Sequence, residues 1–345
     1  MQRNPAPAYL LRTVALLLAL PLGFPGLLFS GGRPATVNHA SAFGGYIQVR
    51  YETASESFGS FSVRRAKVWD AGAIRGTRGW RYKVQVLAAS CKGASPKLLD
   101  AFLEYRRSGW KVRFGQMVPD FTLQRSQPDY RLPVLERADV VNVLHPGAET
   151  LCRDIGVALV ATPRGGFVHA SFGLFNGTGG NRLAGTSAHG MLTHRFFVEW
   201  RRRTLGRLRL GYSLMTRRAT RLRFPKLLGS GVLFSGTDKR GGLEISWQKG
   251  RFYGQAEFLE GRLGTRTARG AYGLATWRVS GSTWLVGYGQ ALRRPLETGT
   301  ERRKASLGCV WQASANRLRL WLFAEWASGG EPSLALRMQV QAMFN

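Results

Sequence analysis

The chain of 345 residues carries 50 Lys and Arg against 20 Asp and Glu, a formal net charge of +30. Such an excess of positive charge argues against a neutral or cationic partner and points to an anionic one. The three cysteines, Cys91, Cys152 and Cys309, are widely and irregularly spaced, which argues against a disulfide framework and against a structural metal site.

The N-terminal segment has the layout of a secretory signal peptide. Arg3 and Arg12 precede an apolar run over 14–29, and an Ala-Ser-Ala site ends at Ala42. Pro and Gly interrupt the apolar run, which favours a cleaved peptide over a permanent membrane helix. We therefore predict a signal peptide over residues 1–42 and a mature chain that begins at Phe43. Beyond residue 42 no uninterrupted apolar stretch reaches the ~18 residues of a membrane-spanning helix.

From residue 43 onward, apolar and polar residues alternate in short segments. In the first segment Ile47 and Val49 oppose Gln48 and Arg50. Because successive side chains of a strand point to opposite faces, this period of two is typical of a strand with one apolar and one polar face. The pattern recurs to the end of the chain. The predicted strands cover residues 43–53, 61–69, 81–89, 98–106, 111–117, 152–162, 166–176, 191–202, 206–216, 240–249, 251–260, 269–279, 282–293, 303–312, 316–327 and 333–344.

Short turns alternate with longer connections between these predicted strands. The two longest connections are 118–151 and 217–239. An even strand count, short turns at one end and longer loops at the other are typical of a bacterial outer-membrane barrel. We therefore predict an all-β fold, a transmembrane antiparallel β-barrel of about 16 strands with short periplasmic turns and longer external loops. At this strand number we expect the lumen to be an aqueous channel and not a packed core.

Many Lys and Arg residues occupy the polar register of the predicted strands. A charge on the lipid face costs about 2–4 kcal/mol at the bilayer midplane, so these cations must face the lumen. Rings of such cations select anions, and guanidinium groups match phosphate and carboxylate geometry. For any single arginine, the alternative is a solvated wall residue without a role in binding. The candidate wall residues are Arg65, Lys67, Arg81, Lys83, Arg113, Arg207, Arg209, Arg317 and Arg319.

Motifs for catalysis or cofactor binding are close to absent. His189 and His194 lack a third metal ligand at suitable spacing, and the Gly-rich segment 175–181 is not followed by a strand-to-helix transition. No Ser and His stand in a motif that would support nucleophilic catalysis. We therefore predict that the protein is not an enzyme and binds no metal and no cofactor.

Seven short segments, in this order, carry a family resemblance. They are FSVRRAK over Phe61–Lys67, GWRYKVQV over Gly79–Val86, Leu98–Tyr105, Val112–Pro119, Val134–Ala138, Arg153–Val157 and Gly173–Gly177. They resemble the N-terminal region of the phosphate-selective porin O and P family. The resemblance covers residues 43–180 and continues further only as strand alternation.

The resemblance implies a sixteen-stranded outer-membrane porin, usually trimeric, whose third external loop folds inward. That loop would be residues 118–151 here, and its cations Arg125, Arg131 and Arg137 become candidate anion-binding residues. Family members that prefer phosphate carry lysines at the constriction, whereas this loop has none. The departure favours general anion selectivity over phosphate specificity.

We therefore predict a passive channel for small anions, phosphate or chloride, which lies in outer-membrane lipid as a homotrimer. One alternative is an outer-membrane barrel with a closed lumen and a structural or enzymatic role. Another is a soluble, secreted basic protein that binds nucleic acid or other polyanions. Such a protein should have polar residues on both faces of many strands, whereas the cations here alternate with Leu, Val, Tyr and Phe. We therefore expect no nucleic-acid partner.

Overall fold

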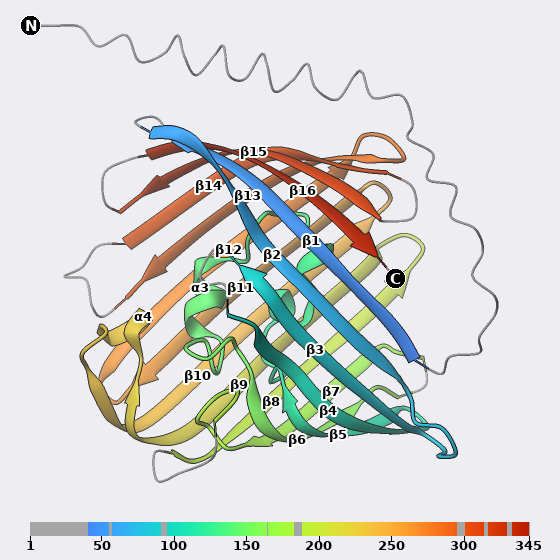
Figure 1. Ribbon diagram of the computed structural model, residues 1–345, viewed down its shortest axis with the longest axis vertical. Helices are drawn as coiled ribbons and strands as arrows, with labels where there is room; N and C mark the ends of the chain where they lie inside the picture. The colour runs from blue at the N-terminus through green and yellow to red at the C-terminus, as the bar shows by residue number, and fades with distance from the viewer. Residues whose placement is uncertain are drawn as a thin grey trace, which may run out of the picture.

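In a computed structural model of the protein, sixteen strands of the described chain close into one antiparallel barrel, in which β1 pairs with β16 (Figure 1). The structure describes residues 41–54, 57–90, 95–163, 165–182, 188–294, 301–313, 317–329 and 333–344. The strands are β1 (Ser41–Ala54), β2 (Ser57–Ala73), β3 (Trp80–Ser90), β4 (Lys97–Arg107), β5 (Trp110–Met117), β6 (Asp154–Ala161), β7 (Val168–Phe175), β8 (Ala188–Arg202), β9 (Gly206–Arg223), β10 (Leu233–Lys249), β11 (Phe252–Leu263), β12 (Arg266–Arg278), β13 (Thr283–Arg293), β14 (Glu301–Gln312), β15 (Leu318–Ser328) and β16 (Ser333–Phe344). The predicted fold class is confirmed.

Each predicted strand corresponds to one observed strand, but the predicted long connection 217–239 is wrong. Strand β9 continues to Arg223 and pairs with Leu233 of β10, so that only 224–232 connects the two strands. A single turn of helix, α4 (Pro225–Leu228), lies in that connection. The predicted signal peptide lies almost wholly outside the described residues, and its last two residues, Ser41 and Ala42, begin β1.

The two ends of the barrel differ in how they connect the strands. At the end where β1 begins and β16 ends, here called the turn end, connections such as 108–109, 203–205 and 250–251 are short. The opposite end, here called the loop end, holds the longest connection, residues 118–153, but also the two-residue connection 264–265. Short turns keep neighbouring strands antiparallel, and the closed ring leaves no strand edge unpaired.

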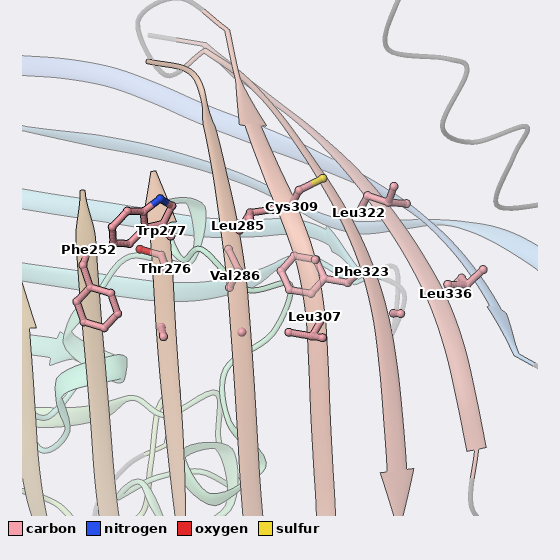
Figure 2. A pocket seen from close by; sticks show the side chains of 14 residues that line it. Phe252, Thr276, Trp277, Leu285, Val286, Leu307, Cys309, Leu322, Phe323 and Leu336 are labelled. Atoms are coloured by element: carbon pink, nitrogen blue, oxygen red, sulfur yellow. The ribbon is translucent and has the colours of Figure 1, made fainter. Parts of the chain in front are cut away.

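The outer face of the barrel is apolar. Side chains such as Leu285, Leu307 and Trp277 point outward and are more than half exposed, as expected for a surface that faces lipid. A hollow of about 670 Å³ lies on this face across β11 to β16, and Figure 2 shows the apolar side chains that line it. It holds no charged residue, so it is not a candidate for binding a charged solute. Among the described residues, no helix is long and apolar enough to cross a membrane.

Residues 118–153, here called the inward loop, fold into the lumen. The loop contains α2 (Leu123–Ser126), the 3-10 turn η2 (Asp129–Arg131) and α3 (Asp139–Leu144), and Figure 1 shows α3 within the ring of strands. The hydroxyl of Thr122 accepts a hydrogen bond from the Arg125 amide and thereby caps α2. Pro146 follows α3 closely and disfavours its continuation.

The inward loop forms a packed core against one side of the lumen. Val140, Val141 and Leu144 are fully buried, and α3 packs against β11, β12 and β13. The expectation of a wholly aqueous lumen is therefore wrong on this side, because burial of apolar surface is worth about 25 cal/mol per Å² and draws the loop onto the strands. The inward-facing residues that receive it, here called the apolar wall, are Leu259, Leu263, Ala268, Tyr272, Leu274, Val286, Leu292, Val310, Trp321 and Phe323.

Candidate functional site in the barrel lumen

In the described part of the chain, the inward loop borders three cavities within the lumen. The turn-end cavity has a volume of about 540 Å³ and lies between the loop and strands β1 to β9. The side cavity, of about 550 Å³, lies on the other side of the loop and shares Arg209 with it. The loop-end cavity, of about 280 Å³, is bounded by β1, β2 and β13 to β16. Arg137 borders both the loop-end and the turn-end cavity, which places it where the two approach each other.

The turn-end cavity is strongly positive. Nine cations line it against three carboxylates, Asp100, Asp120 and Asp129. In a narrow space with low-dielectric walls such an imbalance attracts anions and excludes cations. The cations are Lys67, Lys83, Lys111, Arg113, Arg125, Arg137, Arg153, Arg195 and Arg209.

The carboxylates of this cavity are shared between several cations and leave an excess of positive charge. Asp100 accepts hydrogen bonds from Lys83 at 2.7 Å and from Arg153 at 3.0 Å. Within the described residues, Lys111 and Arg125 form no ion pair with a carboxylate. Burial lowers the pKa of Arg125, because its charge is only partly compensated. An anion that enters the cavity would supply the missing negative charge.

The side cavity has no acidic residue in its lining. It brings together four of the predicted residues, Arg131, Arg207, Arg209 and Arg319. Arg319 donates a hydrogen bond to the Tyr130 carbonyl at 3.0 Å, which ties the strand to the inward loop. The Arg131 guanidinium lies 5.5 Å from the centre of the Tyr130 ring.

Four other predicted residues either lie outside the three cavities or bind groups of the inward loop. Arg81 and Arg317 are exposed at the turn end and border none of the three cavities. Arg65 is bound to Glu136 of the inward loop. Arg137 donates hydrogen bonds to the carbonyls of Gln124, at 3.2 Å, and Gln127, so it maintains the loop as well as lining the path.

The predicted set lacked several arginines that face the lumen, among them Arg195, Arg153 and Arg64. Arg195, between Thr193 and Phe197 in β8, is in the polar register and could have been found by its alternation. Arg153 precedes β6 and faces Asp100 only because the loop returns to the wall there. Arg64 does not follow the polar alternation of its strand. A β-bulge that the sequence pattern does not predict turns it inward.

A side chain of the barrel wall also anchors the backbone of the inward loop. The carboxylate of Glu257 accepts hydrogen bonds from the amides of Leu123, at 2.8 Å, and Gln124, at 2.7 Å, and from the Tyr272 hydroxyl at 2.6 Å. The side chain is 3% exposed. A carboxylate can accept all of these bonds at once because it has two oxygens and no hydrogen to donate.

Glu257→Gln should loosen this anchor. An amide presents one acceptor oxygen and an NH₂ group that opposes the remaining N–H donor, and a buried donor without a partner costs about 1–3 kcal/mol. We expect the amides of residues 123–124 to exchange hydrogen roughly tenfold faster, since about 1.4 kcal/mol corresponds to a factor of ten. Mass spectrometry of exchanged peptides measures this rate. Glu260→Gln, also in β11 and paired with exposed Arg262, is the control. Equal rates in both variants would contradict the anchoring role.

No group of three His, Cys, Asp or Glu side chains in the described part of the chain is arranged to hold a metal ion. His169 lies 2.8 Å from Asp120 and stacks on Phe197, and Asp120 also accepts a hydrogen bond from Arg195 at 2.7 Å. Burial alone would raise the pKa of Asp120, but Arg195 and His169 hold it well below its usual range. The first residues of the inward loop therefore stay fixed to the wall by an ionised carboxylate.

Comparison with known proteins agrees with this architecture. A family model described as phosphate-selective porin O and P matches residues 52–301. No curated protein sequence matches the chain. Among solved structures, OprB of Pseudomonas putida has a TM-score of 0.69 at 9% identity, with 88% of this chain and 94% of that chain covered.

Two further structures have the same fold. OmpT of Vibrio cholerae, described in a trimer form, has a TM-score of 0.65 at 10% identity, with 88% of this chain and 99% of that chain covered. The outer-membrane channel DcaP of Acinetobacter baumannii has a TM-score of 0.62 at 10% identity, with 88% and 97% covered. At such identities the likeness shows the fold alone.

Proposed function

The chain belongs to the phosphate-selective porin O and P family, and on that premise we propose that it forms a water-filled, anion-selective channel for passive diffusion of small anions across the outer membrane. The observation that carries the proposal is the turn-end cavity, where nine cations face three carboxylates. The adjoining side cavity adds three arginines and no acid. Fixed cations along a pore lower the energy of an anion at each point and raise that of a cation.

General anion selectivity is the form of this proposal that the residues support. No lysine lies between Lys111 and Lys226, so the inward loop contributes only arginines. Of these, Arg125 and Arg137 donate hydrogen bonds to loop carbonyls. We propose that chloride and phosphate both pass, with the selectivity for anions over cations set by the summed charge of the wall.

The orientation and assembly follow the same reasoning. The turn end, where β1 begins and β16 ends, would face the periplasm and the loop end would face the exterior. The segment 1–42 would be removed as a signal peptide. The trimer form of the Vibrio cholerae OmpT structure supports a homotrimer for this chain. We propose no enzymatic activity.

Reversal potentials in a KCl gradient across a planar bilayer test the selectivity. We expect the reversal potential to have the sign that chloride permeation produces, because cations outnumber acids along the turn-end and side cavities. A cation-selective channel would refute the proposal.

The packed core between the inward loop and the apolar wall favours one alternative, an outer-membrane barrel with a closed lumen. The same recordings separate the two functions. A closed barrel would give no conductance steps, although the protein is folded and inserted.

A further inference from the structure

Three arginines converge on one carboxylate at the base of the loop-end cavity. One oxygen of Glu136 accepts hydrogen bonds from Arg50, at 2.7 Å, and from Arg64, and the other accepts one from Arg65 at 2.5 Å. Glu136 belongs to the inward loop, whereas the arginines belong to β1 and β2. Arg50 also donates a hydrogen bond to the Leu135 carbonyl of the loop at 3.2 Å. The cluster therefore joins the inward loop to the wall.

A β-bulge builds this cluster. Gln48 pairs with Arg65 and the next residue, Val49, pairs with Val63, so Arg64 is the extra residue of β2. Successive side chains of a regular strand point to opposite faces, but a bulge re-aims one of them. Arg64 and Arg65 consequently bind the same carboxylate from adjacent positions.

The wall holds two of the arginines without the help of Glu136. Arg50 donates to the Gln339 side-chain oxygen at 3.0 and 2.7 Å, and to Glu52 at 3.2 Å. Arg65 donates to the Gln48 side-chain oxygen at 3.1 Å. Their guanidinium groups would therefore keep their positions if Glu136 moved away, and a site that needs no rearrangement binds its ligand at lower cost.

Glu136 is the one member of the cluster that lies on a loop, and its side chain is 29% exposed to the cavity. Burial would raise its pKa, but Arg65, Arg50 and Arg64 outweigh burial and hold the pKa well below its usual range. The carboxylate is therefore ionised at neutral pH. It presents to the arginines what a free carboxylate or phosphate would present, two oxygens with negative charge.

We propose that Arg50, Arg64 and Arg65 form an oxyanion-binding site at the base of the loop-end cavity, and that the Glu136 carboxylate occupies it until an incoming oxyanion displaces it. The proposal rests on the function proposed above. The ligand class is an anion with at least two terminal oxygens, because Arg65 and the Arg50–Arg64 pair bind different oxygens of Glu136. Chloride is a single atom and cannot occupy the positions of both oxygens.

This arrangement has a consequence for transport. Conduction requires binding that is strong enough to admit the ion and weak enough to release it. A built-in carboxylate lowers the affinity of the three arginines for any free oxyanion, since the ligand must first displace it. Glu136 thereby lowers the affinity of the site enough for a bound oxyanion to be released and to continue through the channel.

The test is calorimetric titration of the purified, detergent-solubilised barrel with inorganic phosphate, and separately with acetate and chloride. In Glu136→Gln we expect phosphate to bind at least tenfold more tightly than in the wild type, with a smaller gain for acetate and none for chloride. Glu325→Gln is the matched control, because Glu325 lines the same cavity and pairs with Arg337 instead of the cluster. Equal phosphate affinities in the two variants would overturn the proposal.

Two more variants test whether the gain comes from this site. Glu136→Ala, which removes the competing group altogether, should show the same gain, and retention of the heat-modifiable band on gels confirms that each variant is folded. Arg64→Gln combined with Glu136→Gln should lose the gain. If the double variant binds as tightly as Glu136→Gln, the site lies elsewhere and the proposal is wrong.

Titration does not depend on conduction, so its result is separable from that of the reversal potential. A phosphate gain in a cation-selective or closed barrel would support the site and refute the proposed function. An anion-selective channel in which Glu136→Gln leaves phosphate affinity unchanged would support the function and refute the site.

Discussion

Replacing Lys111 and Arg131 together by Glu should lower the ratio of chloride to potassium permeability by about tenfold. Lys111 lines the turn-end cavity and Arg131 the side cavity. Neither forms an ion pair with a carboxylate in the described chain, so their replacement leaves the anchors of the inward loop in place. Two unit charges 4 Å apart interact by about 1 kcal/mol in water, and screening extends over about 8 Å at physiological ionic strength. Two reversed charges near a narrow path therefore reach the ~1.4 kcal/mol of a tenfold change.

The measurement is the reversal potential of the double variant in a KCl gradient, repeated at two ionic strengths. Arg262→Glu with Arg303→Glu is the matched control, because both side chains are about two-thirds exposed at the loop end and border none of the three cavities. The shift should shrink at high salt and be small in the control. Equal shifts in the two double variants would show that total charge, and not the cavity lining, sets the selectivity.

The largest loss of stability is expected from Asp238→Ala. Asp238 is fully buried and accepts hydrogen bonds from Arg217 at 2.8 Å and from Arg240 at 3.0 Å. Arg240 also donates to the carbonyls of Leu144 and His145 at the end of α3. Removal of the carboxylate would leave two buried guanidinium groups without their anion, and such losses cost about 3–5 kcal/mol.

We expect Asp238→Ala to unfold at a lower urea concentration in lipid vesicles and to accumulate less in the membrane fraction. Glu301→Ala removes an ion pair with Arg303 in which both side chains are largely exposed, and should cost only about 0–1 kcal/mol. A variant Asp238→Ala as stable as Glu301→Ala would mean that the buried cluster contributes nothing to the attachment of the inward loop.

Local alternation accounts for the part of the fold that the sequence predicts. Leu208 and Leu210 alternate with Arg207 and Arg209, and each pair takes the face that its polarity requires. Because the period of two is a property of neighbouring residues, it identifies every strand and most lumen cations without knowledge of their partners. It also limits the prediction to residues in regular register, and for this reason Arg64 was missed.

The inward loop shows where sequence pattern stops being sufficient. The family resemblance implied that it would fold inward, but not that its apolar residues would cover the wall of β11 to β13 or that Glu257 would hold its backbone.

The charge pattern of the amino-acid sequence thus determined a barrel with a basic lumen. Which cations line a path, which are neutralised and which hold the loop was decided by contacts between residues far apart in the chain, such as Glu136 with Arg50 and Asp120 with Arg195. Such contacts depend on the closure of the ring and on the bulge in β2, and a period of two carries no information about either.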